Sequence, residues 1–288
     1  MHEALSRVGP PVMLINSRSR FKSVKSSTLD AMVHNVCMTP SRDLNVLITG
    51  ASSGLGRGMA REFAAKGCNL ALCARRTDRL EELREELGGK HGIRVELRAL
   101  DVNDHDRVFE VFRDFARTLG RIDRVIVNAG VGDGRRIGTG RFDHNRKVME
   151  TNLVAALAQC EAAVEIFREQ NHGHLVLVSS MSAVRGLPGH MTTYAASKAG
   201  LAHLGEGIRA ELMKTPIRVT TLLPGFIRTE LNEDAGKMPF EVDEATGSRA
   251  MVRAIERAPA TACVPGWPWR PIGWVMKILP LKVIAKNA

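Results

Sequence analysis

The chain has 288 residues, of which 44% are hydrophobic and 25% are charged, as in ordinary globular proteins with a substantial core. Its formal net charge of +10 is located at the two ends, because residues 1–42 carry a net +4 and residues 253–288 a net +5. The rest of the chain is nearly neutral. This distribution excludes a basic groove across the folded body, and we therefore expect no nucleic-acid partner.

The first 42 residues are expected to form an N-terminal extension without defined structure. They lack the continuous apolar segment of a signal peptide, and no run in the chain reaches the roughly 20 apolar residues of a membrane span. Met38 opens a short polar lead into the first predicted strand, so an upstream start assignment is an alternative explanation for this segment. The five cysteines lack metal-binding spacing, which predicts no metal site. Their odd number and low density predict a reducing compartment and therefore a cytoplasmic location.

From residue 43 onward, short apolar segments alternate with segments of helical periodicity. Strands are predicted at 45–50, 69–76, 94–100, 124–130, 174–180, 218–225 and 261–264. Helices are predicted at 56–67, 77–88, 104–119, 143–170 and 193–213. Residues 230–248 are expected to be irregular. The alternation predicts an α/β fold with a parallel sheet covered on both faces, which binds ligands beyond the carboxyl ends of its strands.

The first predicted strand ends in a glycine-rich turn, "TGASSGLG", at residues 49–56. Its three glycines would allow a tight turn, close approach to a pyrophosphate and close packing of the next helix on the strand. The start of that helix offers free N–H groups to phosphates. The residues predicted to contact a dinucleotide here are Gly50, Ser52, Ser53, Gly54, Leu55 and Gly56. The alternative is a plain tight turn.

The end of the second predicted strand indicates which dinucleotide is bound. An acidic residue is typical here of NAD(H), because it binds the ribose 2′-hydroxyl. This chain has Arg75 and Arg76 instead, and a guanidinium suits the 2′-phosphate of NADP(H). Asp78 lies too far into the next helix to replace that acid. NADP(H) is therefore favoured over NAD(H), although one of the two arginines is alternatively a solvated loop residue.

Tyr194 is the only tyrosine of the chain, and Lys198 follows it by four residues in a predicted helix. Residues four apart lie on one helix face, so both side chains are expected to face the same cleft. A nearby cation would lower the pKa of the phenol, which is about 10 when free, and make it a useful acid or base. Taken alone, the spacing equally fits a buried tyrosine beside a solvated lysine.

Polar residues also follow other predicted strands, at the edge of the sheet formed by the carboxyl ends of the strands. Ser180 ends "LVSSMS", where its hydroxyl can bond a substrate oxygen, and Asn152 lies in the helix after the fourth strand. The chain thereby resembles the classical short-chain dehydrogenase/reductases over about residues 44–265. The matching pieces are "TGASSGLG", "LDV" (100–102), "NAG" (128–130), Asn152, Ser180, "YAASK" and "PGFIRT" (224–229).

The resemblance implies a doubly wound, Rossmann-type three-layer sandwich with a mostly parallel seven-stranded sheet over residues 43–265, in a homodimer or homotetramer. It implies that Tyr194 is the general acid/base, Lys198 lowers its pKa and binds the nicotinamide ribose, Ser180 positions the substrate oxygen, and Asn152 holds a water in a proton relay. Ser182 is the alternative to Ser180. The other residues that it places against the cofactor are Asp101, Val102, Asn128, Ala129, Gly130, Pro224, Gly225, Ile227 and Thr229.

The resemblance predicts an oxidoreductase that interconverts a ketone or aldehyde and an alcohol by hydride transfer, and the tryptophan-rich C-terminal tail suggests a hydrophobic substrate. Alternatives are a non-catalytic NADP(H) sensor and an epimerase or dehydratase of the same family. Residues 266–288 form a basic tail that holds all three tryptophans. Two interpretations of this tail stay open: peripheral contact with a membrane surface, or packing over the substrate pocket or a subunit contact.

Overall fold

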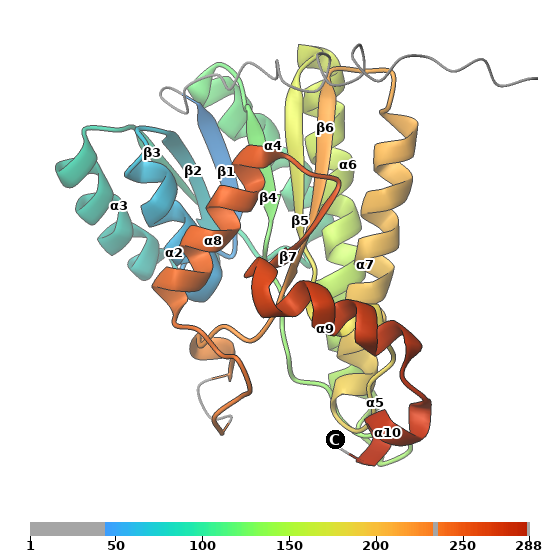
Figure 1. Ribbon diagram of the computed structural model, residues 1–288. Helices are drawn as coiled ribbons and strands as arrows, with labels where there is room; N and C mark the ends of the chain where they lie inside the picture. The colour runs from blue at the N-terminus through green and yellow to red at the C-terminus, as the bar shows by residue number, and fades with distance from the viewer. Residues whose placement is uncertain (1–43, 233–235, 287–288) are drawn as a thin grey trace, which may run out of the picture. The chain divides into compact units, whose positions relative to one another are not determined.

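Seven parallel strands form a single sheet in the order β3-β2-β1-β4-β5-β6-β7 (Figure 1). The computed structural model describes residues 44–232 and 236–286. The strands are β1 (Asn45–Thr49), β2 (Asn69–Ala74), β3 (Val95–Ala99), β4 (Arg124–Val127), β5 (Gly173–Val178), β6 (Ile217–Pro224) and β7 (Thr261–Val264). The predicted α/β fold with a doubly wound, seven-stranded sheet is confirmed. The expected N-terminal extension, residues 1–42, lies outside the described residues.

Helices cover both faces of this sheet (Figure 1). One face carries α2 (Gly54–Ala64), α3 (Thr77–His91) and α8 (Glu244–Arg257). The other carries α4 (His105–Leu119), α6 (Ala155–Gln170) and α7 (Met191–Glu211). The shorter elements are α5 (Phe142–Met149), a π-helical turn η1 (Glu150–Val154), the 3-10 turns η2 (Met181–Val184) and η3 (Glu230–Asn232), and the C-terminal helices α9 (Gly266–Ile278) and α10 (Leu281–Lys286).

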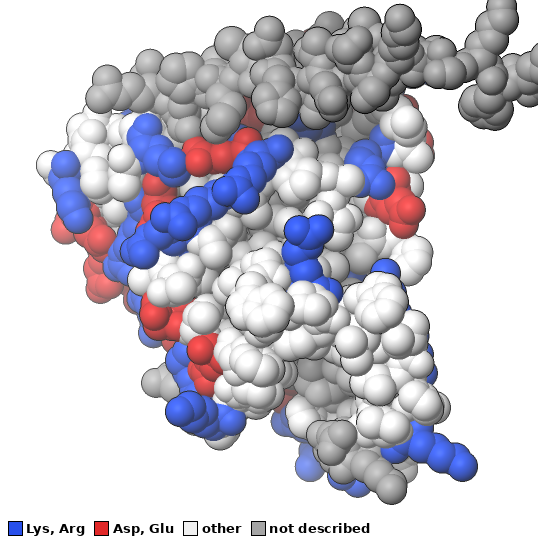
Figure 2. All heavy atoms as spheres, viewed as in Figure 1, with Lys and Arg blue, Asp and Glu red and all other residues white. Residues whose placement is uncertain are grey.

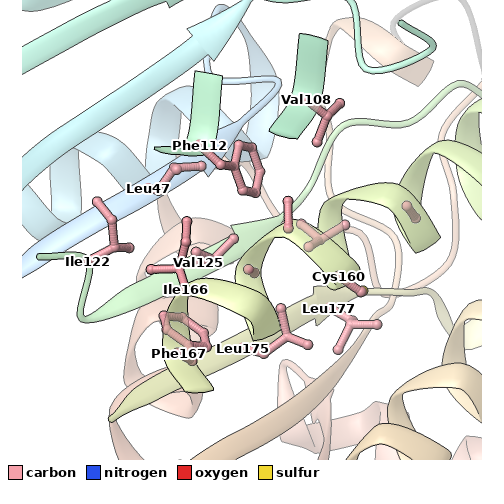
Figure 3. Packing of buried hydrophobic residues seen from close by; sticks show 14 of the residues in the cluster. Leu47, Val108, Phe112, Ile122, Val125, Cys160, Ile166, Phe167, Leu175 and Leu177 are labelled. Atoms are coloured by element: carbon pink, nitrogen blue, oxygen red, sulfur yellow. The ribbon is translucent and has the colours of Figure 1, made fainter. Parts of the chain in front are cut away.

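Each sheet face has its own hydrophobic core. On the α4–α6 side, Phe112 and Phe167 are fully buried against Val125 and Leu175 of the central strands (Figure 3). The central strands β1, β4 and β5 are buried at every position, which explains why they are mostly continuous apolar runs in the sequence rather than alternating patterns. The sheet is therefore a rigid platform, and its carboxyl edge positions the residues discussed below.

Two segments differ from the sequence-based expectation. Residues 230–248 were expected to be irregular, but α8 begins at Glu244, because the Asp243 carboxylate caps it by accepting a hydrogen bond from the Thr246 N–H at 2.7 Å. The single helix predicted at 143–170 is interrupted by η1, which inserts a wider turn between α5 and α6. Both differences depend on local hydrogen bonding that apolar periodicity does not reveal.

The C-terminal tail forms two helices that meet at Pro280, as its prolines suggest. Trp269 in α9 is buried, and its ring packs edge-on to Phe226 with 5.2 Å between ring centroids. Trp267 and Trp274 point outward, with 80% and 66% of their surface exposed. Within residues 44–232 and 236–286, no helix is long and apolar enough to cross a membrane.

Candidate active site

The turn between β1 and α2 is closed too tightly for side chains at its glycines. A Cβ at Gly56 would lie 2.3 Å from the Gly50 carbonyl oxygen and 2.7 Å from the Asn128 side-chain nitrogen. Gly50 and Gly54 have φ values of +66° and +49°, which glycine adopts without strain. The start of α2 therefore lies directly against the end of β1, with its first N–H groups facing the rim of the sheet.

Asn128 at the end of β4 holds this turn in place. Its Nδ2 donates to the Thr49 carbonyl oxygen at 2.9 Å, and its backbone N–H donates to the Thr49 hydroxyl at 3.1 Å. The Ala129 N–H donates to the same hydroxyl at 3.2 Å. Asn128 and Ala129, both expected at the cofactor, thus lie beside the glycine turn. Thr49, which sequence reasoning missed, is fully buried and joins the two strand ends.

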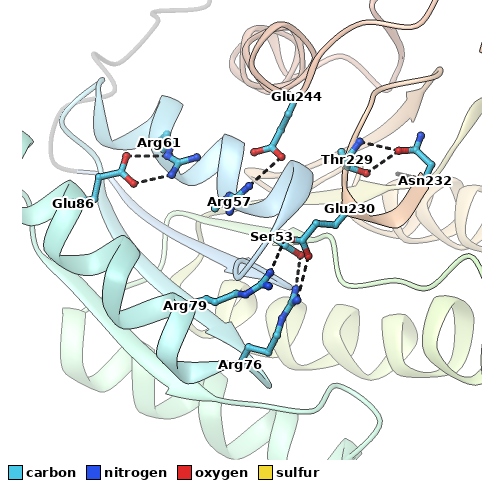
Figure 4. Close-up of polar contacts among 10 residues, drawn as sticks. All are labelled: Ser53, Arg57, Arg61, Arg76, Arg79, Glu86, Thr229, Glu230, Asn232 and Glu244. Carbon is cyan, nitrogen blue, oxygen red and sulfur yellow. Dashed lines mark hydrogen bonds and ion pairs between the residues drawn. The ribbon is translucent and has the colours of Figure 1, made fainter. Parts of the chain in front are cut away.

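Arg76 lies across the glycine turn at the end of β2 (Figure 4). It donates to the Ser53 hydroxyl at 2.6 Å and to the Ser52 hydroxyl at 3.4 Å, and it forms an ion pair with Glu230 at 3.1 Å. Arg75 is more exposed and lies 3.9 Å from Asp101. The predicted arginine pair is therefore split, since only Arg76 contacts the glycine turn.

A polar pocket of about 300 Å³ opens beside this turn. Arg79 contributes to it and forms an ion pair of 2.5 Å with Glu230. Burial opposes the charge of Glu230, but the hydrogen bonds from Arg76 and Arg79 hold its pKa below the ordinary value. Sequence reasoning missed Arg79 and Glu230, because no local pattern connects residues 151 positions apart.

Tyr194 and Ser180 converge at the carboxyl end of β5. The Ser180 side chain interacts with the phenol of Tyr194 and favours the charged form of that phenol. Ser180 also accepts a bond from the Ser182 N–H at 3.1 Å. The Ser182 hydroxyl is buried and has no hydrogen-bond partner among the described residues. The structure therefore brings Ser180, and not the alternative Ser182, to the tyrosine.

Lys198 lies one helical turn after Tyr194 and is buried. Its Nζ donates to the Val178 carbonyl oxygen at 2.9 Å and is 5.9 Å from the centroid of the Tyr194 ring. Burial lowers the pKa of Lys198 to about 8. The backbone carbonyl of Lys198 accepts a hydrogen bond from the Ser179 hydroxyl at 2.7 Å, so the end of β5 holds this turn of α7.

The expected effect of Lys198 on the tyrosine is not seen in this structure. Burial raises the pKa of Tyr194, and the hydrogen bond with Ser180 partly offsets this rise. The ammonium of Lys198 is bound to the Val178 carbonyl and lies 5.9 Å from the centroid of the Tyr194 ring. The influence of Lys198 on the pKa of Tyr194 when a cofactor is bound stays a prediction.

Asn152 lies in the π-helical turn η1 and is completely buried. Its Oδ1 accepts from the Val131 N–H at 2.8 Å, and its Nδ2 donates to the Val131 carbonyl at 2.9 Å and to the Ser197 hydroxyl at 3.2 Å. A Cβ at Gly130 would lie 3.0 Å from the Asn152 Oδ1 and 3.5 Å from the Lys198 Nζ. Turns of this kind are common at functional sites, and this one connects the segment after β4 to the start of α7.

The segment after β6 completes the rim. A Cβ at Gly54 would lie 3.2 Å from the Thr229 Cβ, so this segment contacts the glycine turn. A Cβ at Gly225 would overlap the Trp269 ring, which brings α9 onto the end of β6. Pro224 ends β6 itself, and Ile227 is buried in the core on the α2–α8 side. Of the remaining predicted cofactor residues, Leu55 is half-buried in α2 and Val102 lies in the opposite core.

Comparison with known proteins agrees with this geometry. A family model for short chain dehydrogenases matches residues 44–239. An uncharacterized oxidoreductase of Mycobacterium tuberculosis is 53% identical over 244 residues, which cover 84% of this chain and 96% of the relative. The fold and the sequence match define a Rossmann-type oxidoreductase that binds a nicotinamide dinucleotide. The chain belongs to the short-chain dehydrogenase/reductase family.

Two solved structures illustrate the likeness. An alcohol dehydrogenase from the archaeon Thermococcus sibiricus, complexed with 5-hydroxy-NADP, has a TM-score of 0.69 and 25% identity and covers 77% of this chain and 96% of its own. A short chain dehydrogenase from Mycobacterium paratuberculosis, bound to NAD, has a TM-score of 0.70 and 23% identity and covers 81% of this chain and 100% of its own. The second likeness concerns the fold alone.

Gly56→Ala tests the tight closure of the turn. The added methyl group collides with the Gly50 carbonyl and the Asn128 side chain, so we expect about tenfold or greater loss of NADPH affinity. Gly88→Ala in α3 is the matched control, because nothing lies within 4 Å of its Cβ. Fluorescence titration measures both, and equal affinities of the two variants would contradict the expectation.

Lys198→Met tests the buried amine through pH. Below about pH 8 the buried Lys198 amine is protonated in the native state, and burying this charge lowers the free energy of unfolding. Between about pH 8 and pH 10.5 only the unfolded chain still holds that proton, so the free energy of unfolding rises with pH. We expect Lys198→Met to flatten this rise in urea denaturation. The exposed Lys214→Met should leave it unchanged, and a wild-type slope in Lys198→Met would refute the assignment.

Proposed function

We propose that the protein is an NADP(H)-dependent oxidoreductase that interconverts a ketone or aldehyde and an alcohol on a hydrophobic substrate. The contact between the side chains of Tyr194 and Ser180 carries this proposal. The two hydroxyls converge at the same rim as the glycine turn. A proton donor and a second hydroxyl in this arrangement suit a carbonyl oxygen that gains a proton as its carbon gains a hydride.

The residues of the rim fit a nicotinamide dinucleotide. When bound, the nicotinamide supplies or accepts the hydride. Gly56 lets the start of α2 pack directly against the Gly50 carbonyl, and Ser53 makes no side-chain cap on α2, which leaves the first N–H groups of the helix free for a pyrophosphate. Arg76, held by the hydroxyls of Ser52 and Ser53, supports a preference for the 2′-phosphate.

Tyr194 exchanges a proton with the substrate oxygen, and Ser180, Lys198 and Asn152 assist it. Because burial raises its pKa, the phenol holds its proton at neutral pH and is ready to donate it to a substrate oxygen. In the opposite direction the same oxygen accepts the proton of an alcohol. Ser180 orients the substrate oxygen, and Lys198 supplies a positive charge beside the ribose. Asn152 bonds the Val131 backbone and the Ser197 hydroxyl, and thereby links the segment after β4 to α7.

A hydrophobic substrate is supported by the surroundings of the tyrosine. Thr193, which precedes it, lines a pocket of about 420 Å³ with Ile137, Phe142 and Met149. A non-catalytic sensor on this fold would need the glycine turn but not the Tyr194–Ser180 contact, so catalysis is favoured. An epimerase or dehydratase would use the same residues and is distinguished by its products.

Tyr194→Phe removes the proton donor and keeps the ring. Turnover of a panel of hydrophobic ketones with NADPH should fall by about 10²–10⁴-fold, while NADPH affinity stays within about twofold. Ser180→Ala should lose far more turnover than Ser182→Ala, because only Ser180 reaches the tyrosine. Stopped-flow or steady-state absorbance of NADPH measures each variant. A fully active Tyr194→Phe, or the reverse ranking of the serines, would refute the proposed chemistry.

The assembly and location are part of the same proposal. We propose a homodimer or homotetramer, since Val154 and Leu157, three residues apart where η1 meets α6, both present exposed apolar side chains. Light scattering of the purified protein measures this. Cys73, Cys160 and Cys263 are free thiols, which suits the reducing cytoplasm.

We further propose that α9 and α10 contact an anionic membrane surface. The outer face of these helices exposes Trp267, Trp274, Ile278 and Leu281. Figure 2 shows a surface over α9 that lacks acidic side chains and is bordered by basic ones. The sequence after Glu256 contains no acidic residue. Exposed tryptophans among basic residues suit the boundary between lipid headgroups and acyl chains.

Flotation with lipid vesicles tests this contact. The wild type should rise with vesicles that contain phosphatidylserine, and much less with pure phosphatidylcholine. The double variant Trp267→Ala, Trp274→Ala should stay at the bottom of the gradient. Phe142→Ala, an equally exposed apolar residue of α5, should float as the wild type does. A wild type that never floats, or a double variant that dissociates into monomers, would instead favour a subunit contact.

A further inference from the structure

A carboxylate lies among the arginines to which the proposed function assigns the 2′-phosphate. The side chain of Glu230 forms ion pairs with Arg76 at 3.1 Å and with Arg79 at 2.5 Å (Figure 4). Arg76 reaches the glycine turn through Ser53 with its other guanidinium nitrogen. Glu230 therefore occupies the acceptor position that a phosphate oxygen between these two guanidinium groups would require.

The backbone at Glu230 is held in place by hydrogen bonds within the turn η3. The Asn232 Oδ1 accepts from the Thr229 N–H at 2.8 Å, and the Asn232 Nδ2 donates to the Ile227 carbonyl at 3.0 Å. These two bonds close η3 around Glu230. Thr229 rests against Gly54, so the turn is seated on the glycine turn itself.

The other arginines of the polar pocket have partners of their own. Arg61 forms a bidentate pair with Glu86, with both distances at 2.8 Å, and Arg57 pairs with Glu244 at 3.4 Å. Arg76 and Arg79 share the single carboxylate of Glu230. Arg76, Arg79 and Glu230 together therefore carry one net positive charge. Without the Glu230 carboxylate, both guanidinium charges would be available to a phosphate.

We propose that Glu230 weakens the preference for NADP(H) by competing with the 2′-phosphate for Arg76 and Arg79. This inference rests on the proposed function, since it assumes that these arginines receive that phosphate. The phosphate carries more charge and more acceptor oxygens than a carboxylate, so NADP(H) displaces Glu230 and loses affinity in doing so. NAD(H) has no group at this position and leaves the ion pairs intact. Glu230 thus narrows the gap in affinity between the two cofactors.

The test compares Glu230→Gln with the wild type in direct titrations of NADPH, NADH and adenosine 2′,5′-bisphosphate, a probe that carries the phosphate without the nicotinamide. Glu230→Gln should bind NADPH and the probe about three- to tenfold more tightly, with NADH affinity within about twofold. Glu86→Gln is the matched control. This substitution frees Arg61, which also lines the polar pocket but has no contact with Arg76 or Arg79. We therefore expect it to change none of the three affinities.

The outcomes separate this inference from the proposed function. Unchanged or weaker NADPH binding by Glu230→Gln would overturn the inference, because the carboxylate would then support the arginines or play no part. Equal tightening for NADH would overturn it as well, because the effect would not concern the phosphate. Arg76→Gln tests the proposed function separately. If it leaves NADPH affinity unchanged, the preference for NADP(H) fails, whatever Glu230 does.

Discussion

The contact between the ends of β1 and β4 is the constraint on which the site depends. Thr49 and Asn128 tie these two strand ends together through the bonds described above. On either side of this junction the helices go to opposite faces of the sheet, so a crevice opens there rather than a packed core. Gly56 lets α2 begin inside that crevice. The dinucleotide-binding edge therefore follows from strand order and from one missing side chain.

Burial, more than the neighbouring charge, sets the state of the catalytic pair. Tyr194 and Lys198 are both shifted toward their neutral forms, the phenol keeping its proton and the amine losing its proton more readily. Their spacing in the sequence predicts a shared helix face but not the hydrogen bond from the Lys198 ammonium to the Val178 carbonyl. A cofactor ribose that offers acceptors to Lys198 is a natural competitor for that bond.

Features that repeat along the chain could be predicted, and features that join distant residues could not. The seven strands lie within a few residues of their predicted ends. The central strands β1, β4 and β5 could be predicted because a strand buried on both faces needs an apolar run. The glycine turn and Tyr194 follow from local motifs. By contrast, the ion pairs of Glu230 depend on how two distant loops meet, and no local signal marks them. The choice of Ser180 over Ser182 depends on the direction in which each hydroxyl points.

The packing of Trp269 on Gly225 has a practical consequence for handling the protein. The indole fills the space that a side chain would occupy at the end of β6, and its N–H is buried without a partner among the described residues. Helix α9 is thus anchored on the end of β6. An affinity tag or fluorescent fusion at the carboxyl terminus would follow closely after an anchored helix, so its effect on folding and activity is worth checking against the untagged protein.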